Sequence, residues 1–265
     1  MQRIIRELAL SLWRAELAAD PAQPLRERLD GFSLAHAYAV QRAVSALREE
    51  AGARRVGWKV GLSSVEMLRR AGMQEPFWAP IYDSGQHGSG ATLAVRRFIF
   101  PRVETEVALV LGADLDHRRV SLEEAQAAIA AVHPAFEIVD VRTTTRVLDA
   151  LESTADSGWN AGFVLGPELP ADGVDVSAVT ARILEDYPGT AGQVGQASLL
   201  IGGGPVCCLQ WLAERAHAAR QPLRAGDIIL SGTILPVLPL TPGTTITAEF
   251  TGLSDEPVTV SVSGR

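Results

Sequence analysis

The stretch FPRVETEVALVLG, residues Phe100–Gly112, has the composition of a buried β-strand but places two glutamates in its middle. Alternate side chains of a strand share a face, so Glu104 and Glu106 point to the same side. Burying an unpaired carboxylate costs on the order of several kcal/mol. Either two long basic side chains or a divalent cation would offset that cost. On an edge strand, by contrast, both carboxylates would simply face water.

A third acid, Glu137, lies in a similar apolar setting in the stretch AVHPAFEIVDVR, residues 131–142. Three carboxylates on apolar strands suit a hard cation such as Mg²⁺ or Mn²⁺. These ions take about six oxygen ligands, so three from the protein leave about three positions for water and substrate. A coordination sphere with open positions is what a catalytic metal requires. The pattern therefore indicates a metal site.

Lys59 stands in the otherwise apolar stretch GWKVGL, residues 57–62. A buried lysine near carboxylates can hold an anionic group of a substrate or move a proton. The alternative is a lysine at the end of a strand, with its ammonium group extended to water. The residues alone leave both interpretations open.

Composition excludes several classes of function. The 265-residue chain is 47% hydrophobic and has 24 basic and 31 acidic residues, for a net charge of −7. It lacks a long basic tract, so we expect no nucleic-acid partner. We find neither a signal peptide nor a run of the about 20 apolar residues that a membrane span needs. The two adjacent cysteines, Cys207 and Cys208, form no disulfide framework, and we expect a cytoplasmic protein with no membrane partner.

The predicted elements indicate an α+β fold. Apolar periodicity predicts a helix over residues 2–18 and another from an N-cap at Ser33 to Gly52, which together form a helical N-terminal lobe over residues 1–54. Further helices begin at Ser121, through a capping box with Glu124, and near Pro205. Residues 55–265 are otherwise rich in short strand patterns. The predicted strands are 56–61, 92–99, 103–111, 135–141, 161–165, 179–186, 196–201, 227–231, 245–250 and 257–262.

These stretches together resemble a known family. In order along the chain they are GWKVGL, PFWAPIYD, PRVETEVALVL, HPAFEIVDVR, AGFVLG and LRAGDIILSGT with the following PLTPGTTITAEFTGL. The chain resembles the fumarylacetoacetate hydrolase superfamily, and within it the 2-keto-4-pentenoate hydratase and 4-oxalocrotonate decarboxylase group. The resemblance spans residues from Gly31 to the C-terminus. It implies a mixed β-roll or barrel with covering helices, carrying the metal-binding catalytic site on the domain of residues 55–265.

The resemblance also assigns roles to residues. It implies that Glu104, Glu106 and Glu137 hold Mg²⁺ or Mn²⁺ and that Lys59 is the motif lysine. Asp83, the acid that closes PFWAPIYD, corresponds to a partner in proton transfer. The substrate-binding residues expected from the matching motifs are Gly61, Leu62, Trp159, Asn160, Gly232 and Thr233.

The implied substrate is a short 2-oxo or 2-hydroxydienoic acid whose carboxylate and neighbouring oxygen chelate the cation. The cation would stabilise an enolate, from which water adds at carbon 4 in a hydratase or CO₂ leaves in a decarboxylase. Two alternatives stay open. One is hydrolysis of a carbon–carbon bond, as in acylpyruvate hydrolases, and the other is an inactive scaffold or partner subunit with the family fold. We also expect a homo-oligomer.

Two segments depart from the family pattern. Where group members carry ADNASS, this chain reads ADSGWN, with Trp159 and Asn160 in place of the two serines. After SGT the chain continues ILPVLPL, and Pro236 stands where we expect no proline. Both segments should border the tail of the substrate. Trp159 would fill the tail pocket, stack on an unsaturated substrate, or simply pack.

Overall fold

The computed structural model describes residues 1–144, 148–184 and 192–264. Its helices are α1 (Gln2–Ala18), α2 (Leu34–Glu50), α3 (Val65–Ala71), α4 (Leu122–Ala127), α5 (Ala150–Ala155) and α6 (Pro205–Ala218). Its first strands are β1 (Arg55–Gly61), β2 (Phe77–Tyr82), β3 (Gln86–Gly88), β4 (Ala91–Leu93), β5 (Pro101–Leu111), β6 (Ile129–Asp140) and β7 (Asn160–Leu165). The later strands are β8 (Leu169–Pro170), β9 (Thr180–Ile183), β10 (Gly195–Gln196), β11 (Ile228–Leu230), β12 (Leu238–Pro239), β13 (Thr245–Thr251) and β14 (Ser254–Val262).

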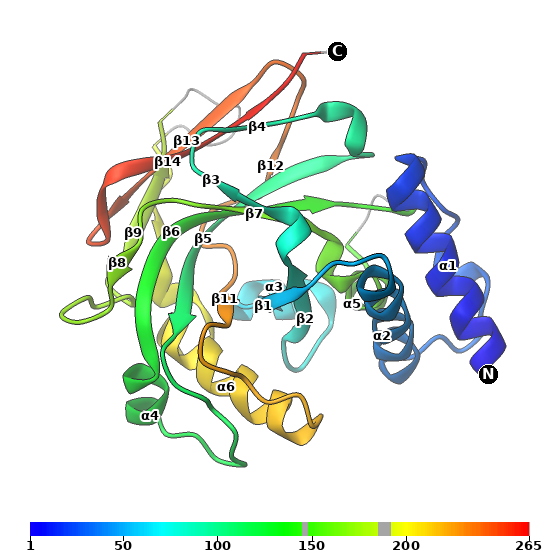
Figure 1. The fold of residues 1–265 in the computed structure, drawn as a ribbon, viewed down its shortest axis with the longest axis horizontal. Helices are drawn as coiled ribbons and strands as arrows, with labels where there is room; N and C mark the ends of the chain where they lie inside the picture. Colours follow the sequence, from blue (N-terminus) through cyan, green and yellow to red (C-terminus); the bar gives the residue numbers. More distant parts are fainter. Residues whose placement is uncertain (145–147, 185–191, 265) are drawn as a thin grey trace.

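The described strands form two sheets (Figure 1). The larger sheet has the order β2-β1-β11-β5-β6-β7-β3, with β12 beside β5 and β8 beside β6. It curls strongly, because β2 and β7 contact each other although four strands separate them in the sheet order. The smaller sheet has the order β10-β9-β13-β14-β4. This arrangement confirms the predicted α+β roll with covering helices.

The N-terminal helices α1 and α2 pack side by side at one flank of the curled sheet (Figure 1). Their facing apolar residues, including Leu8, Leu12 and Val40, form a hydrophobic cluster of their own, to which α5 contributes. The Ser33 side chain caps α2, and Gly52 follows the helix with a φ of 96°, as the sequence predicts. No described helix is both long and apolar enough to span a membrane. The division into two domains stays a prediction.

Both faces of β5 and β6 are buried, and they differ in kind. On one face, Val107 and Phe136 belong to the largest hydrophobic cluster, which also includes residues of α6 and of the smaller sheet. On the opposite face, inside the curl, Ala108, Ala135 and Phe163 form a smaller apolar cluster. Glu104, Glu106 and Glu137 share this inner face by strand alternation. The three glutamates therefore lie on the inner face of the roll, beside an apolar cluster.

Several predicted elements were wrong in detail. The predicted strand 92–99 is β4 followed by a 3₁₀ helix at Val95–Arg97, and most of 196–201 is also 3₁₀ rather than strand. Of the predicted strand 179–186, the structure describes β9 over Thr180–Ile183, whereas residues 185 and 186 lie outside the described residues. The helix after Ser121, which we expected to include Ala125–Ala131, ends at Ala127, since β6 already begins at Ile129. The helices α3 and α5 and the strand β2 were not predicted.

Candidate metal centre

The register of β5 and β6 brings the three glutamates together. Glu104 lies directly opposite Glu137 in the antiparallel pair, and Glu106 lies opposite Ala135, two positions along the same face. Directly opposed residues have Cβ atoms about 4.5–5.5 Å apart. One carboxylate oxygen from each glutamate lies within 4.8 Å of the other two. The predicted E-x-E pair and the third acid thus form one cluster, on two neighbouring central strands rather than at a sheet edge.

Hydrogen bonds orient two of these carboxylates and leave one oxygen of each uncommitted. The backbone N–H of Gly232 donates to Glu106 Oε2 at 2.9 Å, and the Asn160 amide donates to Glu137 Oε1 at 2.9 Å. Glu106 Oε1 and Glu137 Oε2 are buried and have no hydrogen-bond partner. Buried carboxylate oxygens without a partner are costly in a protein interior. Hard, anionic oxygens in this arrangement are the ligands that Mg²⁺ and Mn²⁺ prefer, so the residues fit such an ion.

Lys59 extends from β1 into the glutamate cluster, and this excludes the alternative of an ammonium group in solvent. Its Nζ lies 2.7 Å from Glu137 Oε1 and 3.3 Å from the carbonyl oxygen of Gly158, and the side chain is 3% exposed. Burial alone would lower the pKa of Lys59. The carboxylates of Glu137, Glu104 and Glu106 outweigh that effect, so the pKa of Lys59 lies above its usual value. The ammonium group is therefore charged at neutral pH.

The pKa values of Glu104 and Glu106 are raised, which opposes the gathering of negative charge in this cluster. Burial raises the pKa of Glu104 to about 7, against the effect of Lys59 and with a further contribution from Glu137. Burial and the two neighbouring carboxylates raise the pKa of Glu106 well above its usual value. Without a cation, the cluster holds protons near neutral pH that a metal would displace.

Two tight turns bring backbone groups to the cluster. Ser157, Gly158 and Trp159 all have positive φ, at 53°, 64° and 61°. A Cβ on Gly158 would lie 2.9 Å from both Cε and Nζ of Lys59, so only glycine lets this turn approach the lysine. Gly232, with a φ of 107°, lies so close to Ser63 that a Cβ there would clash with the serine hydroxyl. The carbonyl of Gly158 and the N–H of Gly232 are thereby placed against Lys59 and Glu106.

A cavity of about 500 Å³ opens from Glu104. Trp159 and Thr233, two of the predicted substrate-binding residues, line it. The remaining lining is mainly apolar, and two arginines are the basic residues among it. Its apolar part includes Val139, Val141, Leu148, Leu199, Ile234, Leu235 and Pro236, and the arginines are Arg70 and Arg102.

The other predicted site residues fall into two groups. Gly61 and Leu62 lie beside the aromatic ring of Phe77 and position the end of β1, and neither lines the cavity. Asp83 stands at the far end of the β1–β2 hairpin, where its carboxylate binds the Arg54 side chain at 2.8 Å. Hydrogen bonds from the Arg54 backbone and side chain lower the pKa of Asp83. The structure therefore does not bring Asp83 to the glutamate cluster, and its assignment to proton transfer gains no support.

Sequence reasoning missed Arg102, Gly158 and the two valines of the cavity wall. The alternation that joins Glu104 to Glu106 also places Arg102 on the same face, so the strand pattern contained that signal. Val139 follows Glu137 at the same spacing. Gly158 had no comparable signal, because its approach to Lys59 depends on a tertiary contact between distant segments.

The comparisons with known proteins agree with this geometry. The family described as fumarylacetoacetate (FAA) hydrolase C-terminal matches residues 58–261. The 2-keto-4-pentenoate hydratase of Paraburkholderia xenovorans (strain LB400) is 32% identical over 248 residues, which are 93% of this chain and 91% of the relative. The 2-hydroxyhexa-2,4-dienoate hydratase of Comamonas testosteroni is 29% identical and covers 88% of each chain.

Solved structures share the fold. The 4-oxalocrotonate decarboxylase from Pseudomonas putida G7, complexed with magnesium and adipate, matches with a TM-score of 0.91 and 24% identity over 99% of this chain and 98% of that chain. The fumarylpyruvate hydrolase from Pseudomonas aeruginosa, in complex with Mn²⁺ and pyruvate, matches with a TM-score of 0.59 and 20% identity over 80% and 90% of the two chains. At these identities the likeness shows the fold alone. The family match, the hydratase relatives and the glutamate-bearing roll together place this chain in the fumarylacetoacetate hydrolase family, in the group of the 2-keto-4-pentenoate hydratases.

Proposed function

We propose that this protein is a divalent-metal-dependent lyase that adds water to a short 2-hydroxydienoic acid such as 2-hydroxypenta-2,4-dienoate. The observation that carries the proposal is the buried cluster of Glu104, Glu106 and Glu137, with two carboxylate oxygens free of hydrogen bonds beside the Lys59 ammonium group. Relatives named 2-keto-4-pentenoate hydratase, which align over more than nine-tenths of the chain, support the reaction class. The resident ion would be Mg²⁺ or Mn²⁺.

The cluster would bind the ion through one oxygen from each glutamate and leave positions open for the substrate. A bound Mg²⁺ or Mn²⁺ supplies a Lewis acid that stabilises negative charge on a chelating 2-oxo acid. Hydrogen bonds hold two of the three carboxylates in place. The Gly232 N–H and the Asn160 amide hold the Glu106 and Glu137 carboxylates, and such bonds orient metal ligands and tune affinity.

Lys59 is suited to stabilise charge and to donate a proton rather than to accept one. Its ammonium group is buried beside the cluster, and its pKa lies above the usual value. A buried cation beside the reacting oxygen atoms stabilises the negative charge that develops when a proton moves along the conjugated chain. Because Lys59 is the only lysine of the chain, its role can be tested without interference from another.

The cavity that opens from Glu104 would hold the substrate tail. Its mostly apolar wall suits an unsaturated carbon chain, and Trp159 offers a flat face for it. Decarboxylation of a substrate with a second carboxylate is the alternative branch, because Arg70 and Arg102 also line this cavity and carry the charge to bind it. Among the described residues, no histidine lines the cavity, so a histidine–acid pair to activate water for carbon–carbon hydrolysis is not supported.

The proposal is tested with purified protein, saturating Mg²⁺ and 2-hydroxypenta-2,4-dienoate, by following the loss of dienol absorbance. In parallel, 4-oxalocrotonate is supplied and release of CO₂ is measured. We expect turnover of the dienoate, abolished in Glu106→Gln and in Lys59→Met. Arg42→Gln, which changes an exposed arginine of α2, is the matched control and should keep the full rate. Metal-bound protein without turnover of either compound would contradict the proposed activity.

A further inference from the structure

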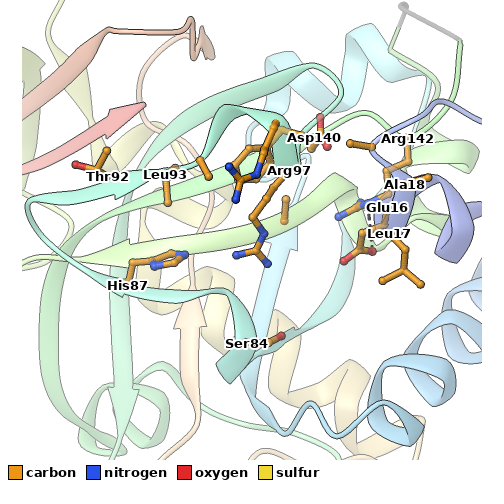
Figure 2. A pocket seen from close by; sticks show the side chains of 15 residues that line it. Glu16, Leu17, Ala18, Ser84, His87, Thr92, Leu93, Arg97, Asp140 and Arg142 are labelled. Atoms are coloured by element: carbon orange, nitrogen blue, oxygen red, sulfur yellow. Dashed lines mark ion pairs between the residues drawn. The ribbon is translucent and has the colours of Figure 1, made fainter. Parts of the chain in front are cut away.

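A second cavity lies on the opposite side of β6 from the glutamate cluster. It has a volume of about 440 Å³ and is bounded by the C-terminal end of α1, the β3–β4 region, the end of β6 and β7 (Figure 2). Alternation along β6 separates the two sites, since Glu137 and Val139 face the interior of the roll whereas Asp140 faces the second cavity. The metal centre and this cavity therefore lie on opposite faces of β6 and are separate sites.

The acids of the second cavity already have partners. Asp140 accepts hydrogen bonds from the backbone N–H groups of Ile99 at 3.0 Å and Phe100 at 2.6 Å. Glu16 lies 3.3 Å from the guanidinium of Arg142 and also binds Arg48 at 2.6 Å. The carboxylates in the wall are thus committed to donors of the protein.

Two of the arginine side chains of the cavity have no partner among the described acids. Arg96 and Arg97, on the 3₁₀ helix after β4, are exposed, and neither guanidinium group makes a hydrogen bond or an ion pair with the described part of the chain. Figure 2 shows His87 reaching toward the cavity from one wall and Arg142 with Glu16 standing on the opposite wall. The partly buried ring of His87 has a pKa lowered by burial and by the charge of Arg97, so it offers a neutral polar edge. The net charge left for a ligand is positive.

The apolar residues that line the cavity favour an organic ligand over an inorganic anion. Leu93, Phe98 and Ala161 give the wall apolar patches between the charged groups. Inorganic oxyanions would leave these patches in water, whereas a short carbon chain would cover them. Arg96 and Arg97 are consecutive residues that both line the cavity, and two guanidinium groups match two carboxylates, which arginine binds with paired N–H donors.

We propose that this cavity is a second binding site, separate from the metal centre, for a small organic dianion with two carboxylates, held mainly by Arg96 and Arg97. The site does not depend on the proposed catalytic activity. Two hydrogen bonds nevertheless connect it to the metal centre. Arg142 donates to the backbone carbonyl of Asn160, and the side chain of Asn160 donates to Glu137. Occupancy of the cavity would therefore bear on a residue that orients a proposed metal ligand.

The test is calorimetric titration of the full-length, Mg²⁺-loaded protein with succinate, which lacks the 2-oxo group that would favour chelation at the metal. We expect saturable binding of one equivalent, at least about tenfold weaker in Arg97→Gln, because a charge-assisted contact is lost. Arg42→Gln should bind as the wild type does. Glu106→Gln should also retain succinate binding, because the two sites lie on opposite faces of β6. Circular dichroism and the Tm of each variant verify that the fold is kept.

Three results of the succinate titrations would overturn the proposal. The first is the absence of saturable succinate binding, and the second is binding that Arg97→Gln leaves unchanged. The third is binding lost in Glu106→Gln, which would place succinate at the metal centre. A parallel titration with inorganic phosphate separates the ligand classes, since tighter binding of phosphate than of succinate would contradict a dicarboxylate site. If sedimentation showed that Arg97→Gln dissociates an oligomer, a second copy of the chain would occupy this face and the proposal would again be wrong.

Discussion

Replacing Asn160 by alanine removes the side-chain amide that holds Glu137, and it should weaken metal binding by a predictable amount. The amide donates to Glu137 Oε1 at 2.9 Å, and both residues are buried. A hydrogen bond to a charged group contributes about 1.5–3 kcal/mol, which corresponds to a factor of about 10–150 in affinity. Loss of a group that orients a metal ligand typically costs about 10–100-fold, so two independent estimates agree.

The assay is a calorimetric titration of Mn²⁺ into metal-free wild-type and Asn160→Ala protein at the same pH. The matched control is Gln41→Ala, which removes another buried amide, one that binds the backbone carbonyls of Trp78 and Thr154 away from the glutamates. Gln41→Ala should lower the Tm while leaving the Mn²⁺ affinity unchanged. If Asn160→Ala folds normally and binds Mn²⁺ as tightly as the wild type, the inference that Asn160 positions a metal ligand is refuted.

Three further predictions concern the same cluster. Glu106→Gln should abolish the rise in Tm that Mg²⁺ gives the wild type, because it removes a ligand charge; an unchanged rise, measured by calorimetry, would exclude Glu106 as a ligand. Burial raises the pKa of Glu104 to about 7, above its value in the unfolded chain. The metal-free protein therefore loses stability as the pH rises from the unfolded pKa to about 7, because the buried group becomes ionised. Metal binding, by contrast, needs the ionised form. The rise in Tm with Mg²⁺ should therefore be larger at about pH 8 than at about pH 6, and the opposite trend would contradict the proposed ligand set. Because Lys59 is the only lysine, ¹³C labelling of lysine gives a single side-chain NMR signal, which in the metal-free protein should show a charged ammonium group up to at least about pH 10; titration of that signal near neutral pH would make Lys59 a base instead.

The sequence contained the glutamate cluster in outline but not its geometry. The spacing of Glu104 and Glu106 fixes a common face by local backbone geometry alone. The position of Glu137 directly opposite Glu104 depends on the register of two strands joined by a long connection, and no local pattern specifies it. The same limit applies to Lys59, whose burial and contact with Glu137 depend on the curl of the whole sheet.

The missed strand β2 shows a second limit. Its sequence, FWAPIY, contains Pro80, and a proline argues against a central strand because it cannot donate to a sheet. In the structure β2 is the edge of the larger sheet, where that missing donor is tolerated. Pro134 in β6 is accommodated differently. It lies between the residues that pair with β8 and those that pair with β7, and its carbonyl accepts from Gly166 at 2.8 Å.

The position of Asp83 in the structure differs from the role that the family resemblance implied. Its place in the stretch PFWAPIYD assigned it to proton transfer, yet the chain brings it beside Arg54 and not to the cluster. Trp159, which departs from the family pattern, does lie at the site, because it lines the cavity that opens from Glu104. Trp159 and Pro236, which differ from the family pattern, thus line the cavity that we propose for the substrate tail.

We propose that Glu104, Glu106 and Glu137 together bind one divalent cation. The most direct measurement is an anomalous-difference map from a crystal soaked in Mn²⁺, recorded at the manganese absorption edge. We expect a single strong peak inside the roll, within bonding distance of one oxygen from each of the three glutamates and close to the Lys59 ammonium group. A saturated crystal with no peak there, or with its peak elsewhere on the chain, would contradict the claim.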